Sequence, residues 1–164
     1  MITKNQYEQF LSFITADLED DWVVIGGSLL AILNAGTRNT TDIDICPLGE
    51  LTNEKRLALM NLALKAGLSI ESINPSADFF LRQIQNWKSS LVLFKSGPKG
   101  NIFRPSLELY LKLKLNRGSD SDILDCISFI EWHKNNLLLI DDKAIKILLE
   151  NYELKKIQPI LQAL

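Results

Sequence analysis

The chain has 164 residues, of which 46% are hydrophobic and 23% charged, and these values exclude a disordered or fibrous chain and fit one domain around a single core. The formal net charge is -2, so the molecule as a whole is not an electrostatic trap for nucleic acid. No apolar run is long enough to span a membrane and the N-terminus has no signal-peptide pattern, so we expect a cytoplasmic protein without membrane contact.

The first part of the chain alternates between helical and strand patterns. Ser28 follows a Gly-Gly pair and is placed to cap the helix after it, which Gly36 ends. Gly67 stands where a helix is commonly terminated. The apolar periodicity predicts helices over residues 3–19, 29–33 and 53–66, and strands over 22–25 and 42–45.

The second part changes from short elements to a helical region. Before residue 106 the patterns predict strands over 68–73 and 91–94, a short helix over 77–84 and a turn over 97–100 that leads to Ile102 and Phe103. After it they predict helices over 106–116, 121–134, 141–151 and 155–163. We therefore expect an α/β (α+β) fold in one domain over 1–164. Its short mixed sheet flanked by helices covers 1–105, and a helical C-terminal subdomain covers 106–164.

The cysteine content argues against a structural metal site. Cys46 and Cys126 lie far apart in the sequence and are typical of buried thiols, with a disulfide as the less favoured alternative. Because the chain has only these two cysteines and one histidine, a structural zinc site is nearly excluded.

The segment WVVIGGSLLAILNAGTRNTTDIDI carries the chemistry. A turn of glycines, here Gly26-Gly27 followed by Ser28, lets an anion approach backbone N–H groups, and the following helix directs its positive end at the same place. Asp42 and Asp44 are two apart on a predicted strand and so share one face. Two carboxylates facing a phosphate loop are suited to Mg²⁺, which prefers oxygen ligands and substrate phosphates.

Together these residues resemble the minimal nucleotidyltransferases of the DNA polymerase β superfamily, whose signature is Gly-Gly/Ser followed by Asp-x-Asp. The nearest group is that of the AbiEii-like and other stand-alone bacterial proteins, some of which are toxins of toxin–antitoxin systems. The resemblance covers roughly residues 20–130. It implies Gly26, Gly27 and Ser28 as nucleotide-binding residues, and Asp42 and Asp44 as catalytic ligands of one or two Mg²⁺ ions.

A later segment, RPSLELYLKLKLNRGSDSDILDC, extends the resemblance. In that group a Lys on a helix precedes an Arg and an Asp-x-x-Asp. By this match Lys112 approaches the nucleotide phosphates, with Lys114 as the second choice. Arg117, Asp122 and Asp125 would then border the site.

The chain departs from the superfamily at the third carboxylate. The superfamily usually supplies it from a later strand as a metal ligand or general base, but the strand Leu91–Phe94 contains no acid. Glu71 is the best substitute and Asp78 the poorer one. If neither reaches the metal ions, activation of the acceptor hydroxyl has no obvious base.

Several of these residues also have a purely structural interpretation. Arg38, on the loop before Asp42, is either a phosphate clamp or a surface arginine. Lys112 is either a phosphate ligand or part of a solvated helix face. Asp122 either pairs with a nearby cation or occupies the acidic first turn of a helix, where Asp120 is the better cap. His133 fits the C-terminal end of a helix better than the role of catalytic base.

The sequence thus predicts a Mg²⁺-dependent nucleotidyltransferase that moves a nucleoside monophosphate from an NTP to an acceptor hydroxyl. The acceptor is a tRNA, a protein or a small molecule. The alternative is a catalytically weak nucleotide-binding or regulatory protein that keeps the fold, and a purely structural domain is a third reading. A homodimer or a cognate partner protein is compatible with either of the first two.

Overall fold

The structure is a computed structural model that describes residues 2–36 and 40–164. It has a mixed α/β fold in which helices surround a five-stranded sheet of order β3-β2-β1-β5-β4. The elements are α1 (Lys4–Asp17), β1 (Trp22–Ile25), α2 (Gly26–Ile32), β2 (Ile43–Pro47), α3 (Asn53–Lys65), η1 (Ile70–Ser72), β3 (Ile73–Asn74), α4 (Phe79–Arg82), η2 (Trp87–Ser90), β4 (Leu91–Ser96), β5 (Asn101–Pro105), α5 (Leu107–Arg117), α6 (Asp120–Asn135), α7 (Asp142–Leu149) and α8 (Leu154–Ala163).

The sheet contains both parallel and antiparallel pairs. β1 runs antiparallel to β2 and parallel to β5, β2 runs parallel to β3, and β4 and β5 form an antiparallel hairpin. All four residues of β1 are buried, because the strand lies in the middle of the sheet. The fold class expected from the sequence is therefore confirmed.

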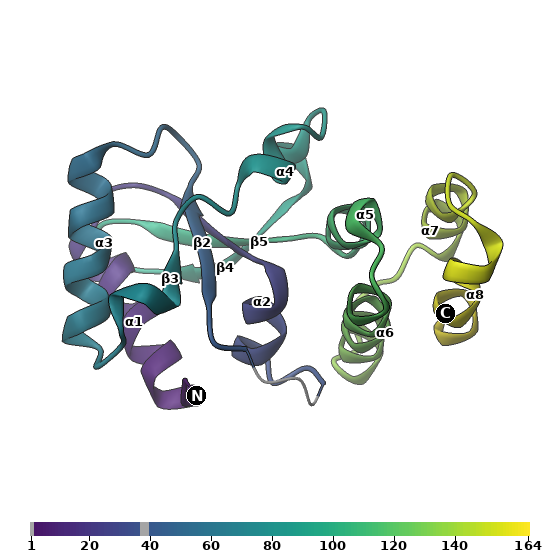
Figure 1. Cartoon of the computed structure of the whole chain (residues 1–164), viewed down its shortest axis with the longest axis horizontal. Coiled ribbons are helices and arrows are strands. Elements are labelled where there is room, and N and C mark those ends of the chain that lie inside the picture. The colour runs from purple at the N-terminus through teal and green to yellow at the C-terminus, as the bar shows by residue number, and fades with distance from the viewer. Residues whose placement is uncertain (1, 37–39) are drawn as a thin grey trace.

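Most of the helices lie in two groups at opposite ends of the molecule, with α2 and α4 between them (Figure 1). Figure 1 shows α1 and α3 at one end of the sheet and α5 and α6 at the other, with α7 and α8 beyond them. One continuous apolar cluster joins the groups, since Phe10 of α1, Val24 of β1, Phe129 of α6 and Ile160 of α8 all belong to it. No helix of the described ranges is long and apolar enough to cross a membrane.

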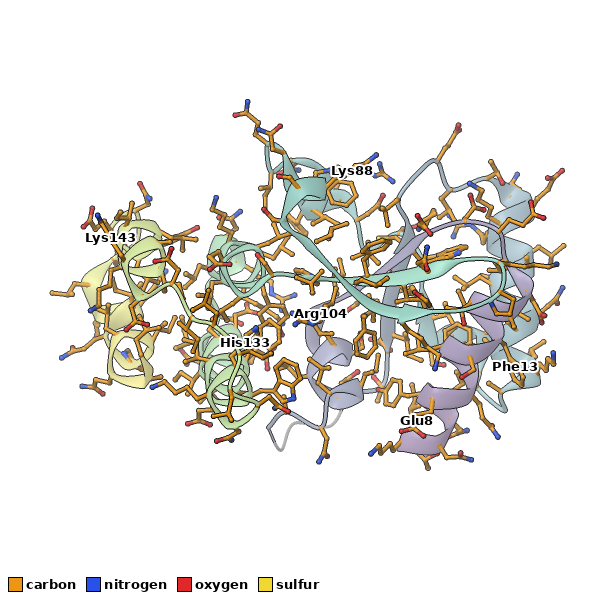
Figure 2. All side chains as sticks on the ribbon, turned by 180° about the vertical axis from the view of Figure 1, so that it is seen from behind. Glu8, Phe13, Lys88, Arg104, His133 and Lys143 are labelled. Atoms are coloured by element: carbon orange, nitrogen blue, oxygen red, sulfur yellow. The ribbon has the colours of Figure 1, made fainter. Side chains whose placement is uncertain are left out.

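Arg104 and His133 are buried where the sheet meets the C-terminal helices (Figure 2). The Arg104 guanidinium lies 5.4 Å from the Trp132 ring centre and 5.8 Å from that of Phe129. His133 lies in the last turn of α6, as the sequence predicted, but its ring is buried rather than solvated. Its Nδ1 hydrogen-bonds the Phe129 carbonyl oxygen at 2.8 Å, and burial lowers the pKa of the ring.

Most helix boundaries follow from capping residues. Thr3 caps α1 in a capping box with Gln6, and Ser106 caps α5. Ser119 rather than Asp120 caps α6, since the Ser119 hydroxyl accepts the N–H of Asp122 and the Asp122 carboxylate accepts that of Ser119.

Three sequence predictions are wrong in extent. Helix α2 ends at Ile32, before Gly36, because Asn34 takes a positive φ and the N–H of Ala35 closes the turn on Leu30. The strand predicted over 68–73 is a 3₁₀ turn over Ile70–Ser72, because the backbone N–H and the hydroxyl of Ser72 both bond the Ser69 carbonyl. Only Ile73 and Asn74 pair with β2. The helix predicted over 77–84 is limited to α4.

Candidate functional site

The junction of β1 and α2 places the Gly26 turn against Asp44, one of the two candidate metal ligands. The antiparallel register pairs Ile25 with Asp44, so the Asp44 side chain lies beside Gly26. Gly26 has φ +69, and a Cβ built on it would stand 2.0 Å from Asp44 Oδ2. Position 26 therefore requires glycine both for its backbone conformation and for the carboxylate that packs against it.

Ser28 connects this junction to β2 and does not cap the helix. Its hydroxyl donates to the Ile25 carbonyl oxygen at 2.8 Å and accepts the Asp44 N–H at 3.1 Å. Ser28 is 1% exposed and sits inside the first turn, because α2 already begins at Gly26. The predicted cap is wrong, and the buried hydroxyl is occupied by backbone groups rather than open to a phosphate.

Asp42 and Asp44 open into one polar cleft of about 400 Å³, whose lining also includes Gly26 and Gly27. Asp44 is half-buried on β2, whereas Asp42 is exposed just before the strand. Burial raises the pKa of the Asp44 carboxyl, and the negative charge of Asp42 acts in the same direction. The Asn74 hydrogen bond and the charge of Lys114 partly oppose this rise.

A neutral amide occupies the place next to Asp44 on the neighbouring strand. The parallel β2–β3 register pairs Asp44 with Asn74, and Asn74 Nδ2 donates to Asp44 Oδ1 at 2.8 Å. Glu71, proposed from the sequence as the third carboxylate, lies in the 3₁₀ turn before β3, is exposed and lines neither cleft around Asp44. Asp78 is also separate, since it forms an ion pair with Arg82.

Two cations from α5 face the same cleft. Lys114 and Arg117 line it together with Asp44, and both lower the pKa of that carboxyl. Lys114 is 5% exposed, and its Nζ lies 2.6 Å from Asp125 Oδ2 and 3.5 Å from Asp122 Oδ1. The buried acids of α6 thus hold the lysine at the edge of the cleft.

Arg117 is held differently and stays more accessible. Its Nε donates to Asp122 Oδ2 at 2.8 Å and its Nη2 to Asp122 Oδ1, while 60% of the side chain remains exposed. Burial alone would raise the pKa of Asp122, but hydrogen bonds from Arg117 and Ser119 outweigh it and hold that pKa well below its usual range. Asp122 therefore positions Arg117 as a carboxylate, and it does not itself line the cleft.

The structure places the other lysine, Lys112, elsewhere. It is exposed and lines a separate hollow with Glu108 and Asn116. Positions two apart on a helix point in nearly opposite directions, so Lys112 and Lys114 cannot face the same site. The choice of Lys112 over Lys114 as the residue beside the site is thus not supported by its position.

The loop before β2 completes the cleft in part. Arg38 lies outside the described residues. Thr40 and Thr41 line the cleft, and the Thr40 hydroxyl donates to the Asp42 carbonyl oxygen at 2.7 Å while accepting the Asp42 N–H at 3.2 Å. Thr41 donates to Asp42 Oδ1 at 3.2 Å. These bonds fix the backbone that carries Asp42.

Besides the two threonines, the sequence analysis did not identify Asn74, which lines the cleft, or Tyr110, which lies next to it. Asn74 follows an apolar residue at the end of a strand, a position at which polar side chains often reach a ligand. Tyr110 donates its hydroxyl to the Gly26 carbonyl oxygen at 3.1 Å and lies on α5 with Lys114 and Arg117. These three positions are spaced i, i+4 and i+7, a helical-face pattern that could have identified Tyr110 and favoured Lys114.

The donor set suits one magnesium ion better than a closed protein cage. In the ranges 2–36 and 40–164, no three or more His, Cys, Asp or Glu side chains gather closely enough to hold a metal. Asp42 and Asp44 supply two carboxylates to one cleft, and Mg²⁺ is usually held by one or two carboxylates together with substrate phosphates. The residues present therefore fit a magnesium ion that arrives with a phosphorylated ligand.

The buried thiols lie outside this chemistry. Cys46 and Cys126 are both buried and free, as the sequence predicted. Burial raises the pKa of both thiols, that of Cys126 to about 12, so neither is activated as a nucleophile.

The chain was also compared with known proteins. No family model, no curated protein and no solved structure matches it. The functional proposal therefore depends on the residues of the cleft and on their chemistry.

Proposed function

We propose that the protein is a Mg²⁺-dependent nucleotidyltransferase of the DNA polymerase β superfamily type, transferring a nucleoside monophosphate from an NTP to an acceptor hydroxyl. The observation that carries the proposal is the single cleft lined by Asp42, Asp44, Lys114 and Arg117 beside the Gly26 turn. Carboxylates for a hard cation and fixed cations for phosphate oxygens are the two components that this chemistry requires.

The cations have complementary tasks in this proposal. Arg117 keeps more than half of its side chain exposed while one edge is fixed by Asp122, so its remaining N–H donors can meet phosphate oxygens. Lys114 is nearly buried and contributes mainly its charge. Both positions are set before the ligand arrives, which reduces the entropy lost on binding.

Asp42 and Asp44 would hold the magnesium ion. When bound, Mg²⁺ neutralises charge that develops on the phosphates and orients the reacting groups. Burial raises the pKa of Asp44, which indicates that its negative charge is costly there despite the two nearby cations, so a bound metal ion would stabilise the carboxylate. A second ion, expected from the superfamily resemblance, would depend on ligands from the nucleotide itself.

A second candidate function is a nucleotide-binding or regulatory protein with little transferase activity. The observation that favours it is Asn74, an amide on the strand next to Asp44, together with the displacement of Glu71 from the cleft. An amide cannot take a proton from an acceptor hydroxyl. Such a protein would bind Mg²⁺ and NTP through the same residues but would lack a strong general base.

The experiment that tests the proposal is a thermal-shift titration with each NTP, with and without Mg²⁺, on the wild type and Asp44→Asn. We expect stabilisation of the wild type by NTP only with Mg²⁺, because a ligand that binds the native state raises the melting temperature. Asp44→Asn should lose that shift while its metal-free stability stays equal or rises, since one of two close negative charges is removed.

A transfer assay then distinguishes the two functions. The wild type is incubated with an α-³²P-labelled NTP, Mg²⁺ and pools of tRNA, protein or small hydroxyl compounds, with Lys112→Ala as a control outside the cleft. Label transferred by the wild type and by Lys112→Ala, but not by Asp44→Asn, supports the enzyme. Mg²⁺-dependent binding without transfer to any pool supports the binding protein, and unfolding of Asp44→Asn would refute the metal site.

A further inference from the structure

A second cleft adjoins the polar one and differs from it in chemistry. It measures about 230 Å³ and shares Gly26, Asp44, Asn74, Lys114 and Arg117 with the polar cleft. Its remaining lining is mostly apolar and includes Phe79, Phe80, Tyr110 and Leu113. The two clefts thus form one elongated site with a charged end and an aromatic end.

The aromatic end exposes two large apolar side chains to solvent. Phe79 is 65% and Phe80 55% exposed, and their rings meet edge to face with centres 5.2 Å apart. The core contact of α4 comes instead from Leu81, which is fully buried in the cluster beneath. An apolar ligand that covers the two rings would remove this surface from water, which is favourable.

The helix that presents these rings is held in place. Arg82 forms an ion pair with Asp78, and its Nη2 donates to the Gly49 carbonyl oxygen at 2.7 Å and to that of Pro47 at 3.3 Å. These bonds tie α4 to the end of β2. The Tyr110 ring on the other element of the cleft is likewise fixed, by its hydroxyl bond to Gly26.

We propose that this cleft binds the nucleobase of the donor nucleotide, by stacking on Phe79 or Phe80, while the triphosphate occupies the polar cleft. The proposal rests on the proposed function. It follows from continuity, because Lys114 and Arg117 line both clefts, so a ligand that meets them with its phosphates can extend into the part lined by Tyr110 and the two phenylalanines. A flat, largely apolar ring is the part of a nucleotide that suits this end.

The cleft predicts weak selectivity among bases. Stacking accepts the π-face of every base, so the larger purines should bind more tightly than pyrimidines without strict discrimination. Asn74 and Ser76 supply the polar groups at this end of the lining, and Asn74 is already bonded to Asp44.

The test compares ATP, UTP and inorganic tripolyphosphate by isothermal titration in Mg²⁺. The proteins are the wild type, Phe79→Leu, Phe80→Leu and Phe79→Ala/Phe80→Ala, and the control is Leu124→Ala, an equally exposed apolar residue of α6. We expect the double variant to bind ATP roughly tenfold more weakly, the loss expected for a base that no longer stacks. Tripolyphosphate affinity should not change, and each Leu variant should lose part of the ATP affinity, because it stays apolar but has no flat ring.

The outcomes separate this inference from the function it rests on. Equal ATP affinity in the wild type and the double variant would overturn the base site while leaving the nucleotide site intact. Equal weakening of ATP and tripolyphosphate would also overturn it, since the phenylalanines would then act on the phosphate end. A wild type that binds neither ligand would refute the proposed function itself. Circular dichroism of each variant confirms that the fold is kept.

Discussion

The substitution Gly26→Ala tests whether the carboxylate of Asp44 is as close to the glycine turn as the structure shows. A methyl group at position 26 would stand 2.0 Å from Asp44 Oδ2 and 2.9 Å from its Cγ, both far inside van der Waals contact. It would also force an alanine to adopt φ +69. The variant therefore strains the backbone and displaces the proposed metal ligand at the same time.

The expected cost is the sum of these two effects. A non-glycine residue in the left-handed region costs about 1–2 kcal/mol. The Asp44 side chain can rotate away, but it then loses its hydrogen bond to Asn74, which contributes about 1 kcal/mol. We expect the free energy of unfolding to fall by roughly 2–3 kcal/mol, which for a chain of this size lowers the melting temperature by roughly 4–12 °C.

Gly27→Ala is a matched control on the adjacent residue. A Cβ there has only the Thr40 methyl group within reach, at 4.0 Å, and the residue lies inside α2 at negative φ. Alanine should therefore leave stability unchanged or raise it by up to about 1 kcal/mol. Urea unfolding followed by circular dichroism measures both variants.

The double variant Gly26→Ala/Asp44→Ala separates the clash from the strain. Replacing Asp44 by alanine removes the two closest atoms but leaves its Cβ, 3.2 Å from the new methyl group. The double variant should recover part of the loss relative to the sum of the single changes, a coupling that a double-mutant cycle measures. If Gly26→Ala costs no more than Gly27→Ala, the contact between Gly26 and Asp44 is absent and the geometry of the site is refuted.

Two further predictions concern charges around the site. Asn74→Asp should raise Mg²⁺ affinity several-fold and lower metal-free stability, because a third carboxylate would stand beside Asp44. Mn²⁺ titration by electron paramagnetic resonance measures the affinity, and urea unfolding without metal measures the stability. Unchanged affinity would refute the role of Asn74. Asp122→Asn should cost roughly 3 kcal/mol at pH 7 by leaving Lys114 and Arg117 under-compensated. Because the pKa of Asp122 is lowered on folding, its contribution to the free energy of unfolding is complete above the ordinary aspartate value of about 3.9 and disappears as pH falls towards the lower folded value. In urea unfolding, the stability difference between wild type and Asp122→Asn should therefore shrink below about pH 4. A difference that stays constant with pH would contradict this prediction.

Local patterns predicted the fold well where the elements are long or strongly marked. The β-branched run at Trp22–Ile25 is the central strand, and the helix predicted over 106–116 is α5, which Ser106 caps with its side chain. The strand predicted over 68–73 is wrong at Ile70–Ser72, because the hydrogen bonds of Ser72 to Ser69 favour a turn there. Short elements carry too few residues for periodicity to decide.

The candidate site shows the same division between local and long-range information. The Gly-Gly turn and the Asp-x-Asp pair are local motifs, and the structure brings Gly26, Gly27, Asp42 and Asp44 to one cleft. Asn74 could not be placed from the sequence, because its position depends on the parallel register of β3 against β2. Such a register is set by packing across the sheet and not by neighbours in the chain.

The charge balance of the site explains why metal and nucleotide should depend on one another. Asp42 and Asp44 repel an incoming triphosphate, and the charges of Lys114 and Arg117 are partly compensated by Asp122 and Asp125. A polyanion alone therefore gains little from the cleft, and a cation alone finds only two carboxylates. Together, the cation neutralises the carboxylates and the phosphates complete its coordination. An active transferase and an inactive binding protein share this balance, so Mg²⁺-dependent binding identifies the site, whereas only transfer to an acceptor separates the two functions.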